Sequence, residues 1–240
     1  MDIEFVFLDF GGVITSNRWG AKDYALIARD SLLSAGYKLE KNFIDVFIEI
    51  YRRHRRESLR TLRELNIRKV LEDVLGRFSI DYNAIDAIIN RYKKGEFCKI
   101  NVGIDKVLEG IRRLGIGLAI VSNAILRYHD YVLENYGILK FFETIVLSCE
   151  VGYRKPDTRI YLEALKRLNV DPRKSIYVGD IPEIDVPGAK KLGMITIIIR
   201  HEEPYTYADL MPISTADITP DYYVDTVHEL VDTITMIKNT

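Results

Sequence analysis

Reactive side chains stand at or soon after the ends of predicted strands in this 240-residue chain. A carboxylate interrupts the first strong apolar run, which extends from Phe5 to Ile14. A carboxylate in such a run is costly to bury unless it has partners or a task. Three later segments add a hydroxyl, an amide, an ammonium and two more carboxylates. The side chains concerned are Asp9, Ser122, Asn123, Lys155, Asp180 and Asp185.

These groups suit the transfer of a chemical group through an aspartyl intermediate. A carboxylate would be the nucleophile, because it can attack and then hold the transferred group covalently. Lys155 alone cannot balance so many acids, so a divalent cation with oxygen ligands is expected among them. Mg²⁺ is the usual choice beside phosphates.

From residue 101 onward, helices alternate with short apolar strands. Continuous runs of Ile and Val between helices indicate parallel strands that are buried on both faces. Ligands of such sheets bind beyond the carboxyl ends of the strands. The tail from Glu202 to Pro220 is expected to be a loop. Strands are predicted at 4–8, 117–121, 144–147, 175–178 and 195–199, and helices at 104–114, 128–136, 158–168, 187–192 and 224–237.

The segment from about residue 20 to residue 96 has a different pattern and contains no proline. Its apolar residues recur at the three-and-four spacing of amphipathic helices, as in Phe43, Phe47 and Ile50. We expect about four helices here, forming a separate module. The predicted fold class is therefore α/β, with a core of residues 1–15 and 100–240 and an inserted all-helical domain of residues 16–99.

Composition narrows the class of protein. The net charge of −1 gives no overall field that would favour nucleic acid or an anionic membrane. Two cysteines and four scattered histidines argue against a disulfide framework or a zinc site. The N-terminus lacks the basic start of a signal peptide, and no apolar run approaches the roughly 18 residues of a membrane span. We expect a soluble, cytoplasmic protein, and the absence of glutamine favours a thermophilic source.

The reactive residues fall in four motifs that occur in order along the chain. Their order on an alternating α/β pattern resembles the haloacid dehalogenase superfamily, a group dominated by Mg²⁺-dependent phosphatases. The resemblance covers residues 1–15 and about 100–200, implies a Rossmann-like core, and makes the helical insertion similar in position to the family's cap. The motifs are Asp9-Phe10-Gly11-Gly12-Val13, Val121-Ser122-Asn123, Lys155-Pro156-Asp157 and Val178-Gly179-Asp180-Ile181-Pro182-Glu183-Ile184-Asp185.

The resemblance implies a role for each residue at the phosphoryl group. Asp9 would attack phosphorus, and Ser122 with the Asn123 amide would hold the phosphoryl oxygens. Lys155 would neutralise the charge that nucleophile and phosphate share. The expected enzyme is a hydrolase, a phosphatase of a small phosphorylated metabolite, and the sequence does not decide between a monomer and a homodimer.

The resemblance also implies a Mg²⁺ site. Asp9, the Gly11 carbonyl and Asp180 would bind the ion, and Asp185 would support the metal shell. Oxygen ligands of this kind suit a hard divalent cation.

One position departs from the family's pattern. Family phosphatases usually carry a second aspartate two residues after the nucleophile, where this chain has Gly11. That aspartate protonates the leaving oxygen and then activates water, and its loss would cost roughly 10²–10⁴-fold in rate. Tyr153, Asp157 and His54 are candidates for the missing proton donor.

Two other functions fit part of the pattern. A 2-haloacid dehalogenase expels a halide that needs no proton, so Gly11 would be no handicap. Dehalogenases work without metal, however, and Asp180 and Asp185 would repel a carboxylate substrate. A phosphate-binding regulatory protein with weak or no turnover would also account for the missing acid.

Overall fold

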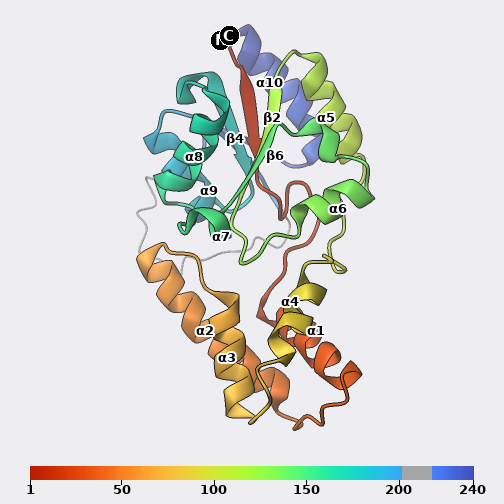
Figure 1. Cartoon of the computed structure of the whole chain (residues 1–240). Coiled ribbons are helices and arrows are strands. Elements are labelled where there is room, and N and C mark those ends of the chain that lie inside the picture. The colour runs from red at the N-terminus through yellow and green to blue at the C-terminus, as the bar shows by residue number, and fades with distance from the viewer. Residues whose placement is uncertain (202–217) are drawn as a thin grey trace.

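One parallel sheet with helices on both faces lies above a layer of four helices in the computed structural model, which describes residues 1–201 and 218–240 (Figure 1). The sheet has six strands in the order β3-β2-β1-β4-β5-β6, and each pair of neighbours is parallel. The α/β class predicted from the alternating pattern is thereby confirmed. The strands are β1 (Phe5–Leu8), β2 (Gly117–Ser122), β3 (Thr144–Leu147), β4 (Ser175–Gly179), β5 (Ile195–Ile199) and β6 (Tyr222–Val224).

Alternate side chains of the strands enter two separate cores, as the pleat of a strand requires. Val6 and Leu8 of β1 pack into the core under α5, α6 and α10, whereas Phe7 between them packs under α8 and α9. Both faces of the sheet are therefore buried. The flanking helices are α5 (Ile104–Arg113), α6 (His129–Asn135), α7 (Ser148–Val151), α8 (Thr158–Leu168), α9 (Pro182–Lys191) and α10 (Leu230–Asn239).

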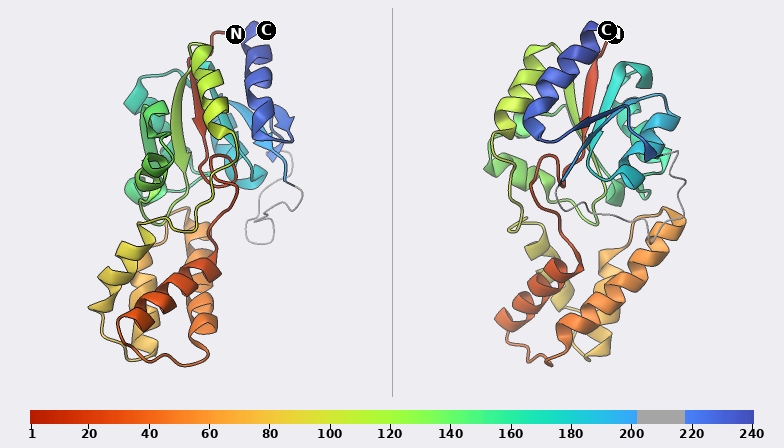
Figure 2. Two further views of the ribbon diagram at one scale, coloured as in Figure 1. Left: turned by 90° about the vertical axis from the view of Figure 1, so that its right-hand side faces the viewer. Right: turned by 180° about the vertical axis from the view of Figure 1, so that it is seen from behind.

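The four helices between β1 and α5, which we call the helical layer, have a hydrophobic core of their own. They lie beyond the carboxyl ends of the strands, as the turned views in Figure 2 also show. Among the residues described, no helix is both long and apolar enough to cross a membrane. That the layer is a separate domain stays a prediction from its sequence pattern. Its helices are α1 (Ala21–Ser34), α2 (Phe43–Thr61), α3 (Ile67–Arg77) and α4 (Ala84–Tyr92).

Two helix boundaries predicted near the C-terminus are wrong. The helix expected from Pro187 begins five residues earlier, because Pro182 occupies the first turn, where a missing N–H costs nothing. Pro187 lies inside α9 instead. The closing helix expected from Val224 begins at Leu230, since Val224 ends β6, a strand that we did not predict. Most of the expected loop from 202 to 220 lies outside the described residues.

A buried histidine makes the sheet core sensitive to acid. His129 opens α6 and is 1% exposed. Its ring lies 4.4 Å from the Tyr128 ring and 4.3 Å from the Phe10 ring, measured between centroids. Burial lowers its pKa from 6.5 to about 3. The folded protein therefore keeps this imidazole neutral under conditions in which the unfolded chain protonates it.

We expect His129→Phe to reduce the acid sensitivity of folding. Because the folded-state pKa is the lower one, the stabilisation is complete above about pH 6.5 and is lost as the pH falls toward 3. Between pH 7 and pH 5 the wild-type protein should lose about 2 kcal/mol more free energy of unfolding than the variant. Urea unfolding at the two pH values measures this difference. Equal losses in both proteins would contradict the prediction, and the exposed residue His228, changed to Phe, is the control.

Candidate active site

Asp9 stands where the central strand of the sheet ends. Its backbone N–H still donates to the Val178 carbonyl at 2.9 Å, which continues the β1–β4 pairing by one residue. The carboxylate is held by the Phe10 backbone N–H, 2.7 Å from Oδ1. The chain then turns through Gly12, whose φ of +78° favours glycine. This turn leaves the Asp9 side chain, 11% exposed, at the carboxyl edge of the sheet.

Lys155 is the centre of a buried polar network. Its Nζ lies 2.9 Å from Asp9 Oδ2 and 2.7 Å from Asp185 Oδ1, and it donates to the Tyr177 hydroxyl at 2.6 Å. Lys155 is fully buried, so these three oxygens replace water around its charge. Asn123 fixes the backbone of Lys155, because its Oδ1 accepts from Lys155 N–H at 2.8 Å and its Nδ2 donates to the Lys155 carbonyl at 3.2 Å.

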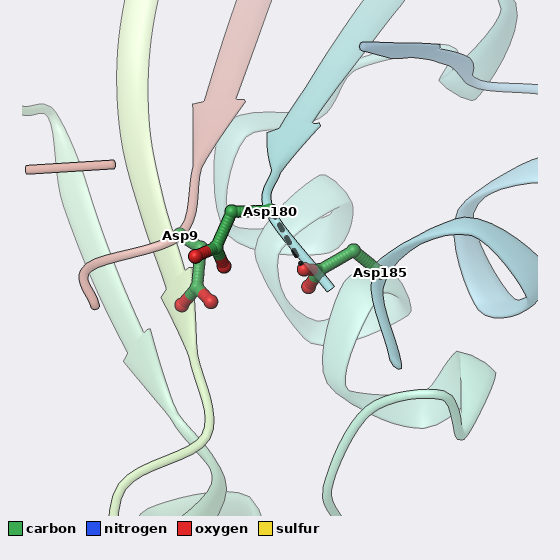
Figure 3. Close-up of side chains that lie close together, drawn as sticks. All are labelled: Asp9, Asp180 and Asp185. Carbon is green, nitrogen blue, oxygen red and sulfur yellow. Dashed lines mark hydrogen bonds between the residues drawn. The ribbon is translucent and has the colours of Figure 1, made fainter. Parts of the chain in front are cut away.

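Three aspartates converge beside this lysine (Figure 3). Asp9 follows β1, Asp180 follows β4 and Asp185 lies in the first turn of α9. Each offers a carboxylate oxygen, and these oxygens all lie within 4.8 Å of one another. Asp185 is oriented by the backbone N–H groups of Asp180 and Ile181, which donate to its Oδ2 at 3.0 and 2.9 Å.

Charge in this cluster is unevenly balanced. Burial raises the pKa of Asp9, the Lys155 ammonium lowers it in part, and the charge of Asp185 raises it again. Burial alone would lower the pKa of Lys155, but the same two carboxylates raise it, so that the ammonium form is kept. Burial is the largest of these effects, so the pKa of Asp9 is raised despite its ion pair with Lys155.

The donor set fits a hard divalent cation. Asp180 Oδ1 is buried and accepts no hydrogen bond from any described residue. Its Oδ2 faces the guanidinium of Arg18 and lies 3.2 Å from Nε2 of His201. All three acids supply oxygen, which Mg²⁺ prefers, and a second cationic charge would offset the excess of carboxylates. The oxygens of Asp185 already accept four donors, so this residue suits support of a metal shell.

A cavity of about 100 Å³ opens in front of Asp9, between the sheet and the helical layer. The predicted site residues Gly11, Ser122, Asn123 and Lys155 line it together with Asp9. Such a volume is small for a ligand site, which favours a small metabolite. The structure therefore brings the predicted phosphoryl-binding residues to one place.

The candidates for the missing acid are elsewhere. Asp157 is the N-cap of α8 and pairs with Arg159. His54 Nε2 lies 2.9 Å from Asp73 Oδ2, and Tyr153 accepts a hydrogen bond from a neighbouring arginine at 3.2 Å. None of the three is among the residues that line the cavity.

The sequence prediction missed one polar residue of the site, Tyr177. Tyr177 orients both Lys155 and Asp185, yet it stands in an apolar strand where its hydroxyl gives no sequence signal. Arg18 passes over Gly11, since a Cβ built at Gly11 would lie 3.1 Å from Arg18 Cγ. An arginine thus fills the space next to the position that holds an acid in family phosphatases.

Comparison with known proteins gives the family. The family described as haloacid dehalogenase-like hydrolase matches residues 38–199, more than half of the chain. The chain belongs to the haloacid dehalogenase-like hydrolases. The matched range includes Ser122, Lys155, Asp180 and Asp185 but begins after Asp9.

Individual relatives within the haloacid dehalogenase-like hydrolases match over shorter stretches. A glyceraldehyde 3-phosphate phosphatase of Methanopyrus kandleri is 36% identical over 124 residues, which is 52% of this chain and 52% of the relative. A phosphoserine phosphatase of Thermus thermophilus is 34% identical over 103 residues, 41% of each chain. The first of these matches thus spans about half the length of the relative.

Solved structures of haloacid dehalogenase-like hydrolases share the whole fold. A phosphatase of this superfamily from Thermococcus onnurineus has a TM-score of 0.64 at 21% identity, covering 97% of this chain and 98% of the other. A 2-haloacid dehalogenase from Pseudomonas syringae has a TM-score of 0.68 at 20% identity, covering 98% and 99%. At such identities the likeness concerns the fold alone, since one fold serves several functions.

Proposed function

We propose that this chain is a Mg²⁺-dependent phosphatase that hydrolyses a small phosphorylated metabolite through an aspartyl-phosphate on Asp9. The observation that carries the proposal is the buried cluster of Asp9, Lys155, Asp180 and Asp185 at one edge of the sheet. The phosphatase names of the relatives support it.

Asp9, Lys155 and Ser122 each have a separate role in the proposed phosphoryl transfer. Asp9 attacks phosphorus while the bond from phosphorus to the ester oxygen breaks and the alcohol leaves. The resulting acyl phosphate is then hydrolysed by water, which releases inorganic phosphate and restores the carboxylate. The Lys155 ammonium, 2.9 Å from Asp9, reduces the repulsion between the carboxylate and the phosphate. Ser122 closes β2 and lines the cavity, where its hydroxyl would donate to a phosphoryl oxygen.

Asn123 has two parts with separate tasks. Its side-chain amide is committed to the backbone of Lys155. We therefore assign its backbone N–H to the phosphoryl oxygens. Together with the Ser122 hydroxyl this N–H would form a preorganised donor pair, which stabilises the charge of the transition state.

Mg²⁺ would be held by Asp9, the Gly11 carbonyl and Asp180, with Asp185 as support. When bound, it supplies positive charge that stabilises the phosphoryl oxygens during transfer. Because no acid follows Asp9 at residue 11, a leaving group that departs without protonation should react fastest.

Hydrolysis of para-nitrophenyl phosphate by the purified protein tests this proposal. Its leaving group needs little protonation, so the assay bypasses the gap at Gly11. We expect turnover with millimolar Mg²⁺ and a loss of at least about 10²-fold after chelation with EDTA, restored by added Mg²⁺. Asp180→Asn should shift the Mg²⁺ concentration for half-maximal activity upward.

Two other outcomes would contradict the phosphatase. Chloride release from 2-chloropropionate in the presence of EDTA would indicate a dehalogenase. Tight phosphate binding without turnover of any phosphate ester would indicate a regulatory protein.

A further inference from the structure

The cavity has a second charged wall that phosphoryl transfer does not use. Arg55 of α2 and Arg154, which follows α7, line the cavity along with Asp9. Lys155 points into the sheet side of the site, where it meets Asp9. Arg154, its neighbour in sequence, points the other way and donates to Ser58 Oγ of α2 at 3.2 Å. The two cations therefore serve opposite ends of the cavity.

This wall is built where the helical layer meets the α/β core. The chain after α2 pairs with the chain after α7 through a bridge between Arg63 and Tyr153, and Arg154 N–H donates to the Leu62 carbonyl at 2.9 Å. In Figure 1 the end of α2 approaches α7 from below. Arg154 is thereby fixed from both sides, which a specificity-determining side chain needs.

Arg154 is a buried residue with one unsatisfied hydrogen-bond donor among the described contacts. The residue is 2% exposed, yet its Nε meets no hydrogen-bond acceptor within the described part of the chain. A buried guanidinium with an unmade hydrogen bond is costly, because the lost hydration is not replaced. A ligand acceptor in the cavity would remove that cost.

One carboxylate joins the two arginines of this wall. It is that of Glu64, whose Oε1 lies 3.0 Å from Arg55 Nη1 and 3.5 Å from Arg154 Nη1. Glu64 Oε2 accepts a hydrogen bond from Ser148 at 2.7 Å. The Arg154 pair is therefore the longer of the two, and the Nε of this arginine has no acceptor among the described residues. A buried guanidinium with such a donor suits a carboxylate, which can accept from it and balance its charge.

We propose that Arg154, with Arg55 beside it, binds a carboxylate at the end of the substrate remote from the phosphate. The substrate is then a small phosphorylated carboxylic acid, held by Lys155 at its phosphate and by Arg154 at its acid. This inference rests on the phosphatase function proposed above and specifies its substrate class. An aldehyde or alcohol in place of the carboxylate would give the Arg154 guanidinium no charged acceptor.

A matched pair of substrates tests this inference. 3-Phosphoglycerate and glycerol 3-phosphate share a three-carbon skeleton and a phosphate ester, but one ends in a carboxylate and the other in an alcohol. We expect kcat/KM of the wild-type protein to be at least about tenfold higher for the acid, chiefly through KM. Glyceraldehyde 3-phosphate, named for several relatives, should rank with the alcohol.

Substitution of Arg154 distinguishes a role in substrate binding from a purely structural role. Arg154→Gln should lower the acid-to-alcohol ratio of kcat/KM by at least about tenfold, and Arg154→Lys should retain part of it. A purely structural role would lower kcat/KM for both substrates alike and leave the ratio unchanged. Arg63→Gln is the matched control, since this exposed arginine stacks on Tyr153 at the same junction without lining the cavity.

The acid-to-alcohol ratio of kcat/KM in the wild-type protein tests the proposed substrate class without any variant. Turnover of para-nitrophenyl phosphate with equal kcat/KM for acid and alcohol would overturn the substrate class while the phosphatase stands. An unchanged ratio in a folded Arg154→Gln protein would overturn the role of Arg154. Absence of turnover with every phosphate ester would overturn the phosphatase, and this inference with it.

Discussion

Asp9→Asn is expected to lower kcat for para-nitrophenyl phosphate by at least about 10³-fold while the protein stays folded. A carboxamide is a poor nucleophile, so no acyl phosphate forms, and single removals of a nucleophile cost this much or more in other enzymes. The amide has nearly the shape of the carboxylate. It can still accept from the Phe10 N–H, so the turn after β1 should persist.

The measurement is steady-state kinetics with saturating Mg²⁺, paired with thermal unfolding of both proteins. Asp157→Asn is the matched control, because Asp157 belongs to the same motifs but caps α8 outside the cavity. Asparagine is nearly as good an N-cap as aspartate, so this control should keep both activity and stability. Full activity in folded Asp9→Asn protein would exclude Asp9 as the nucleophile.

The second large effect concerns stability. Replacing the fully buried Lys155 with methionine removes the cation that both Asp9 and Asp185 contact. Breaking a buried ion pair by deleting one partner typically costs about 3–5 kcal/mol, because the remaining charge stays desolvated. We expect Lys155→Met to lower the free energy of unfolding by that amount at pH 7 without metal, and to abolish turnover.

Urea unfolding followed by circular dichroism measures this loss. In the double variant Lys155→Met with Asp185→Asn, one unpaired charge is gone, so part of the stability should return. The control is Lys190→Met on α9, whose ammonium forms a half-exposed pair with Asp221. Such pairs contribute at most about 1 kcal/mol. If Lys155→Met lowered the free energy of unfolding by less than about 1 kcal/mol, the ion pairs of Lys155 with Asp9 and Asp185 would not be needed for stability.

Local signals account for the parts of the fold that the sequence predicts well. The bounds of α8 follow from Asp157, whose side chain accepts from the Arg159 N–H, and from Asn169, which ends the helix in a left-handed conformation. The apolar runs of β3 and β5 fix those strands in the same way. Asp9, Ser122 and Asp180 could be grouped because parallel strands bring their carboxyl ends to one edge.

The remainder depends on contacts between distant segments. The pairing of Glu64 with Arg55 and Arg154 joins α2 to the chain after α7, and nothing in the local sequence around Arg154 indicates it. The proposed specificity of Arg154 therefore depends on tertiary contacts and could not be predicted from the local sequence. The start of α9 is a different case, since it is local: Pro182 already occupies the first turn, so Pro187 falls inside the helix.

The position of β1 in the sheet has a consequence for the order of folding. This first strand lies between β2 and β4, so its two partners begin at Gly117 and Ser175. While the ribosome makes the intervening chain, both hydrogen-bonding edges of Phe5–Leu8 stay unpaired. The helical layer, by contrast, has all of its helices within residues 21–92. Local contacts form faster than distant ones, so nascent chains should acquire the helical layer first and the pairing of β1, the strand that precedes Asp9, last.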